Sequence, residues 1–178
     1  MGKAVKPIKN IEVELRFLEH VSIYEPRVET YWSIARAGAY RSTEVLNLKV
    51  EDIKRVLKKG YFDFLEKKTG KYRCPYINRD MKIKLETIIK GKEDHEYIIQ
   101  SKRGVNQPLC YRQMQELIVK YGKQCGLYDI GTHTPRKTSA YHLFIETRDI
   151  ERVRKFLGHK NKSSTYAYID STEEEKKE

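Results

Sequence analysis

The sequence lacks the features that stabilise or anchor several classes of protein. Its three cysteines, Cys74, Cys110 and Cys125, are an odd number at scattered positions without metal-ligand spacing. We interpret them as reduced thiols, which argues against a disulfide framework and against a zinc site. No apolar run has the length of a membrane span, and the N-terminus has no signal-peptide pattern. These absences predict a soluble protein of the cytoplasm.

The chain also has no internal repeat, no low-complexity linker and no carboxylate cluster suited to Mg²⁺, so we predict no metal site. Its 178 residues are enough for one domain with a proper core. We divide it into a flexible lead-in at residues 1–10, a folded domain at 11–170 and a charged tail at 171–178.

Positive charge is in excess. The chain holds 36 Lys and Arg residues against 25 Asp and Glu, a net charge of +11. Because the last eight residues hold four glutamates and two lysines, residues 1–170 carry a net charge of +13. This excess favours a polyanionic partner, most simply nucleic acid. A lysine-rich surface kept for solubility or heat stability is an alternative that charge alone does not exclude.

Most of the chain has the apolar spacing of amphipathic helices, as in residues 11–22, 79–92 and 109–126. Between residues 56 and 77 the period shifts towards two, on both sides of the Gly-containing turn KKTGK at 67–71. We therefore predict a mainly α fold with a small antiparallel β-sheet, in the α+β class.

The run LGHKNKSSTYAY at residues 157–168 follows a predicted amphipathic helix at 149–156. Gly158 stands where a left-handed C-terminal cap is expected, and Ser163 or Ser164 is expected to cap a following helix. Taken alone, this run indicates a helix end, a polar loop and two packed tyrosines.

Two upstream stretches change that interpretation. Residues 38–48, GAYRSTEVLNL, hold Arg41 ahead of a short predicted helix, and residues 132–136, THTPR, contain the pattern H-x-x-R. With the run above, they resemble the boxes of the tyrosine recombinases, the phage integrase family. The last family box is L-G-H followed by a tyrosine nine residues after the histidine, and here Tyr168 follows His159 by nine. The boxes stand in the family's order and span most of the chain.

The resemblance implies a mainly helical catalytic domain that cuts and rejoins double-stranded DNA through a 3′-phosphotyrosyl intermediate. The implied role is site-specific recombination, such as integration or excision of a mobile element. Because the phosphodiester energy is kept in the covalent bond, no cofactor is implied. The family's catalytic roles fall on the nucleophile Tyr168, the phosphate clamps Arg41 and Arg136, the base or hydrogen-bond donor His133, and the phosphate donor His159.

These residue types suit that chemistry. A free tyrosine has a pKa of about 10, so it needs a base or nearby cations to become nucleophilic. Two guanidinium groups can grip the phosphate oxygens and stabilise transition-state charge without metal. Glu44 is expected to orient Arg41, although on the residues alone the two could simply form an i,i+3 pair.

The family also has a catalytic lysine in the turn between the last two strands of its sheet. Lys68, within the sequence K-T-G, is our choice for the general acid, and Lys71 is the alternate; for any single lysine a solvated surface position is the competing interpretation. Tyr166 is the alternate nucleophile, but it follows His159 by seven residues. The basic residues expected to contact DNA are Lys67, Lys71, Arg103, Lys137, Lys160 and Lys162.

The sequence departs from the family pattern in three places. Lys137 stands where the H-x-x-R box often continues with histidine, and Pro135 replaces the usual leucine. Family members usually carry a further N-terminal helical domain that clamps DNA, whereas residues 1–37 alone precede the first box. We therefore expect an isolated catalytic domain or a naturally truncated protein, with the tetrameric synapse on DNA belonging to the full-length form.

Two other functions compete with recombination. A type IB topoisomerase-like nicking-closing enzyme resembles this constellation of residues and its chemistry. A non-catalytic basic DNA-binding protein could keep the same side chains as a phosphate-binding surface.

Overall fold

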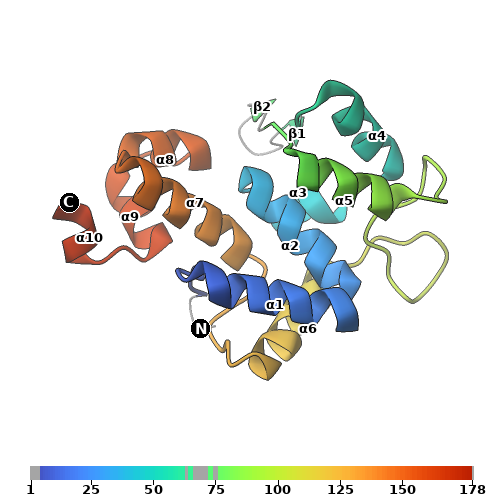
Figure 1. Ribbon diagram of the computed structural model, residues 1–178, viewed down its shortest axis with the longest axis horizontal. Coiled ribbons are helices and arrows are strands. Elements are labelled where there is room, and N and C mark those ends of the chain that lie inside the picture. The colour runs from blue at the N-terminus through green and yellow to red at the C-terminus, as the bar shows by residue number, and fades with distance from the viewer. Residues whose placement is uncertain (1–4, 63, 66–71, 74–75, 178) are drawn as a thin grey trace.

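The chain folds into helices and one short strand pair, in a computed structural model that describes residues 5–62, 64–65, 72–73 and 76–177 (Figure 1). The mainly helical fold predicted from the sequence is confirmed. Within the described ranges, no helix is long and apolar enough to cross a membrane. The elements, in order, are α1 (Ile11–Tyr24), α2 (Pro26–Gly38), α3 (Ser42–Leu46), α4 (Val50–Lys59), β1 (Phe64–Leu65), β2 (Tyr72–Arg73), α5 (Arg79–Ile89), α6 (Tyr111–Gln124), α7 (Thr134–Thr147), α8 (Ile150–Leu157), α9 (Lys162–Ile169) and α10 (Glu173–Lys177).

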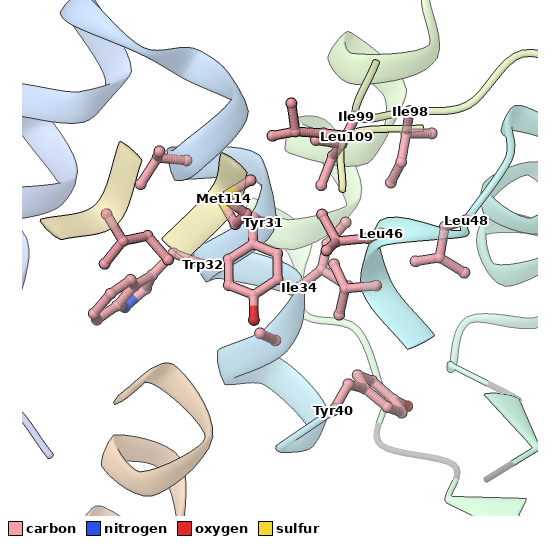
Figure 2. Close-up of a cluster of buried hydrophobic side chains, with 14 of the residues drawn as sticks. Tyr31, Trp32, Ile34, Tyr40, Leu46, Leu48, Ile98, Ile99, Leu109 and Met114 are labelled. Atoms are coloured by element: carbon pink, nitrogen blue, oxygen red, sulfur yellow. The ribbon is translucent and has the colours of Figure 1, made fainter. Parts of the chain in front are cut away.

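Helix α2 lies at the centre of the larger core (Figure 2). Its side chains Tyr31, Trp32 and Ile34 are fully buried. The Glu14 carboxylate is buried beside them, and it accepts hydrogen bonds from Trp32 Nε1 at 2.8 Å and from Arg36 Nε at 3.2 Å. A buried carboxylate with these partners does not incur the large penalty of an unpaired charge. Around α2 the core is completed by residues such as Leu46, Leu48, Ile98, Ile99, Leu109 and Met114.

A second, smaller core holds α7, α8 and α9 together, on the side of the molecule away from α4 and α5 (Figure 1). Helix α7 packs on both α2 and α8, so it connects the two cores. The H-x-x-R box begins α7, and the L-G-H box joins α8 to α9. The buried members of this core are Ala39, Ala140, Tyr141, Phe144, Ile150, Val153, Leu157 and Ile169.

Part of the N-terminal segment makes contacts with the rest of the domain. The Lys6 N–H donates to the Asp129 carbonyl at 2.7 Å, and the Ile8 N–H donates to Thr138 Oγ1 at 2.9 Å. Ile8 itself is only 5% exposed. Its burial depends on α7, more than a hundred residues away, and local sequence pattern carries no signal of that contact.

The charged tail also folds against the domain. Glu175 on α10 accepts a hydrogen bond from the Tyr141 hydroxyl at 2.7 Å, and it forms an ion pair with Lys9 at 3.2 Å. Lys9 and α10 are therefore in contact beside α7.

The strands β1 and β2 pair antiparallel, with Phe64 opposite Arg73 and Leu65 opposite Tyr72. An isolated antiparallel bridge joins Tyr61 to Tyr76. The predicted turn between the strands, with Lys67, Lys68 and Lys71, lies outside the described residues.

Candidate active site

The first arginine box, residues 38–48, runs from the end of α2 through α3, and Arg41 lies in the turn between these helices. The Glu44 carboxylate accepts the Arg41 backbone N–H at 2.8 Å, and it accepts Arg41 Nη1 at 3.2 Å. The Glu44 side chain is 6% exposed and that of Arg41 is 24% exposed. One carboxylate thus caps the start of α3 and holds the guanidinium at the surface. The i,i+3 ion pair of Arg41 with Glu44 and the contact expected to orient Arg41 are therefore the same contact.

Arg136 connects all three boxes from inside the fold. Its side chain is buried, and it donates from Nη1 to the Ala39 carbonyl and from Nη2 to the Leu157 carbonyl, the latter at 2.8 Å. Ala39 lies two residues before Arg41, and Leu157 lies two residues before His159. The planar guanidinium therefore fixes the first arginine box and the L-G-H box relative to the H-x-x-R box.

Tyr31 makes a second connection that the sequence did not reveal. Its hydroxyl donates to the Thr132 carbonyl at 2.7 Å and is 2.9 Å from Ser42 Oγ. Ser42 follows Arg41, and Thr132 precedes His133. Burial raises the pKa of the Tyr31 phenol above its ordinary value, so the group stays a neutral hydrogen-bonding link at neutral pH.

His133 lies just before α7, and solvent reaches its side chain. Its pKa is lowered from the ordinary value, first because the surrounding protein removes part of the hydration that its charged form needs. Repulsion by the cations of Arg136, Lys137 and Arg41 adds to this effect. At neutral pH the imidazole is therefore uncharged and able to accept a proton.

The final box brings His159 against Tyr168. Their rings meet edge to face, with centroids 5.0 Å apart and planes at 87°. His159 Nδ1 lies 3.2 Å from Thr165 Oγ1, and that hydroxyl also donates to the Asn161 carbonyl at 3.1 Å. The predicted left-handed cap at Gly158 is confirmed, with φ of 69°.

The start of α9 differs from the sequence expectation. Asn161 is the N-cap and its side chain accepts the Ser164 N–H at 2.8 Å, so neither Ser163 nor Ser164 is the cap. Asparagine is as good a cap as serine, and Asn161 lies at the position where the chain leaves the L-G-H loop and α9 begins. The alternate nucleophile Tyr166 packs edge to face on Phe144, with centroids 5.7 Å apart.

Three boxes distant in sequence thus meet where the turn between α2 and α3, the start of α7 and the turn between α8 and α9 come together. The family model described as the phage integrase family matches residues 12–175. The chain belongs to the phage integrase family. The resemblance inferred from the three boxes is confirmed, and family members of the tyrosine recombinase type are enzymes that cut and rejoin DNA.

Curated phage integrase relatives carry recombinase names. The probable integrase/recombinase YoeC of Bacillus subtilis is 29% identical over 170 residues, which cover 96% of this chain and 92% of YoeC. The tyrosine recombinase XerA of Pyrococcus horikoshii is 29% identical over 134 residues, which cover 74% of this chain and 46% of XerA. The chain therefore spans nearly all of the first relative and about half of the second.

Solved phage integrase structures share the fold at lower identity. A crystal structure of XerA recombinase superposes with a TM-score of 0.73 and 19% identity, covering 97% of this chain and 61% of that one. A lambda integrase dimer bound to a COC′ core site superposes with a TM-score of 0.66 and 20% identity, covering 96% of this chain and 61% of that one.

The remaining predicted DNA-contact residues of this chain differ in their surroundings. Lys160 and Lys162 are exposed beside His159, whereas Arg103 lies elsewhere, in a cleft of about 550 Å³ that also contains Arg27 and Arg112. Lys137 is half-buried, and this burial lowers the pKa of its ammonium while Asp170 acts in the opposite direction. In the part of the chain that the structure describes, no three metal-ligating side chains gather.

Proposed function

We propose that this chain is the catalytic domain of a site-specific DNA recombinase that forms a 3′-phosphotyrosyl intermediate. The observation that carries the proposal is the double contact of Arg136, which joins the first arginine box and the L-G-H box to the H-x-x-R box. Recombinase and integrase names among the relatives support recombination over topoisomerase-like relaxation or simple binding. The DNA-bound lambda integrase supports DNA as the partner.

In the proposed reaction the Tyr168 phenol oxygen attacks the scissile phosphorus, and the bond from phosphorus to the 5′-oxygen breaks. The phenol proton must leave, because tyrosine is protonated at neutral pH. His133 suits the role of base, since its lowered pKa keeps the imidazole neutral. The departing 5′-oxygen receives a proton from Lys68, with Lys71 as the alternate acid. Rejoining is the reverse, with a 5′-hydroxyl attacking the phosphotyrosine.

Charge on the pentavalent phosphorus is stabilised by Arg41, Arg136 and His159. Arg41 is held in place by Glu44, so its geometry is set before DNA arrives. Arg136 is anchored by two carbonyls, and a guanidinium carries five N–H donors, so anchoring and phosphate binding are compatible.

DNA is bound by basic side chains around this site and by Arg103 in the separate cleft, and a tetramer holds two duplexes. We propose residues 11–170 as the catalytic unit, because the boxes and both cores, apart from Ile8, fall within them. A DNA substrate places the protein in the cytoplasm of a prokaryotic cell or of the host of a virus or plasmid. The residues proposed to contact DNA are Lys67, Lys71, Arg103, Lys160 and Lys162.

The proposal is tested with a nicked suicide substrate, which loses the 5′-hydroxyl fragment after cleavage and so traps the covalent adduct. A labelled DNA strand that migrates with the denatured protein is the expected result. Transfer of that strand to a second duplex distinguishes recombination from nicking and closing on one duplex. Binding without any adduct would leave only the DNA-binding function.

Lys68→Ala is expected to slow cleavage of ordinary DNA by about 100-fold or more, because the 5′-oxygen then leaves without a general acid. A 5′-bridging phosphorothiolate should restore the rate, since sulfur leaves without protonation. Single-turnover rates on both substrates provide the measurement. If Lys71→Ala shows this rescue instead, the acid is Lys71; rescue of neither removes the role from this turn.

Cleavage is expected to proceed at the same rate in excess EDTA, because the stabilising charges proposed here are guanidinium and imidazole groups. Adduct formation by metal-free protein, with and without added Mg²⁺, is the measurement. Activity that appears only with Mg²⁺ would contradict this mechanism.

A further inference from the structure

Lys137 lies directly after the anchored Arg136, on the first turns of α7, and it reaches across to α9. Its Nζ is 4.9 Å from the centroid of the Tyr168 ring. The same ring has the His159 edge contact on another side, at 5.0 Å between centroids. The proposed nucleophile is thus held between a cation and an imidazole, contributed by the H-x-x-R box and by the L-G-H box.

A lysine that only attracts DNA phosphate does not need this arrangement. Lys160 and Lys162 are exposed, as expected for side chains that bind DNA phosphate, whereas Lys137 is half-buried against an aromatic ring. A cation within about 6 Å of a ring centroid is attracted to the ring, more strongly where water is partly removed. Negative charge that develops on the phenol oxygen during attack is also stabilised by a nearby ammonium.

We propose that Lys137 is a positioning residue for the nucleophile: its ammonium keeps the Tyr168 ring docked against His159 and favours the phenol oxygen as it becomes negative. This inference rests on the proposed function, in which Tyr168 attacks the phosphorus. It replaces the role predicted from the sequence, in which Lys137 was one of several phosphate contacts. The neighbouring Arg136 contacts backbone carbonyls, so the two adjacent cations have different tasks.

The test compares Lys137→Met, which keeps the length of the side chain and removes its charge, with Lys137→Arg, which keeps a cation that can lie over the ring. Adduct formation is followed in single turnover at saturating suicide substrate, and DNA affinity is measured separately over a range of salt concentrations. Lys155→Met, at an exposed position on α8, removes the same charge away from the ring and is the matched control. Thermal unfolding of each variant verifies that it folds.

We expect Lys137→Met to form adduct about tenfold more slowly with unchanged DNA affinity, and Lys137→Arg to recover most of the rate. Lys155→Met should match the wild type in adduct rate. If Lys137→Met instead weakens binding, lowers the salt slope by about one and keeps its rate at saturation, the lysine is a phosphate contact and the inference is wrong. Equal losses in the Met and Arg variants would also overturn it.

Failure of the proposed function gives a different result. Tyr168→Phe measured in parallel reports on the nucleophile itself. A Tyr168→Phe variant without adduct beside an unimpaired Lys137→Met variant would retain the proposed function and reject the role of Lys137. Adduct formed by Tyr168→Phe would reject both.

Discussion

Tyr168→Phe should form no covalent adduct with DNA and should bind DNA as the wild type does. The substitution removes the one oxygen that is proposed to attack phosphorus, while the ring can keep its edge contact with His159. Because the charged groups near the site are unchanged, the phosphate attraction that dominates affinity should also be unchanged. Suicide-substrate trapping measures the first quantity, and a binding titration at fixed salt measures the second.

Tyr166→Phe is the matched control, since it removes the same oxygen from a tyrosine that lies on the same helix and packs on Phe144. It should form adduct at close to the wild-type rate. If Tyr166→Phe is inactive and Tyr168→Phe still forms adduct, the nine-residue offset from His159 has identified the wrong tyrosine.

Arg136→Met should reduce both stability and activity, because one buried side chain anchors the three boxes and is proposed to bind the phosphate. Loss of the charged hydrogen bonds to the Ala39 and Leu157 carbonyls should lower the free energy of unfolding by roughly 2–4 kcal/mol. Adduct formation should fall by about 1,000-fold or more once a transition-state stabiliser is removed. Urea unfolding and single-turnover cleavage measure the two effects.

Arg136→Lys separates the two contributions, because it keeps the charge but loses the planar fork. It should regain part of the stability and little of the activity. Arg152→Met, at an exposed position on α8, controls for the removal of an arginine. Near-normal cleavage by Arg136→Met in folded protein would remove this residue from the mechanism.

Local parts of the site were predictable from the sequence. The Arg41–Glu44 contact and the Gly158 cap each involve residues within a few positions of one another, where helix geometry dictates proximity. The boxes and their order could also be recognised from the sequence, because each box is a short stretch of consecutive residues. The cap of α9 was misassigned because several polar residues of equal capping ability stand in a row, and only the path of the chain selects Asn161.

The contacts between boxes were not predictable. The links from Tyr31 to Ser42 and Thr132, and from Lys137 to Tyr168, depend on how α2, α7 and α9 pack. From the sequence alone, Tyr31 is explained equally well by core packing, and Lys137 by a position on a charged surface. The packing of Ile8 was missed for the same reason, because its partner Thr138 is distant in sequence.

The Tyr31 hydroxyl links the neighbours of Arg41 and His133, whereas Tyr168 is held by a different core. Arg41 and His133 are each one residue away from a partner of that hydroxyl, so their separation is set deep inside the larger core. Tyr168 instead belongs to an eight-residue helix in the smaller core, anchored there by Thr165 and Ile169. A displacement of α9 would therefore move Tyr168 and the Thr165 contact of His159, while the separation of Arg41 and His133 stays fixed by the larger core.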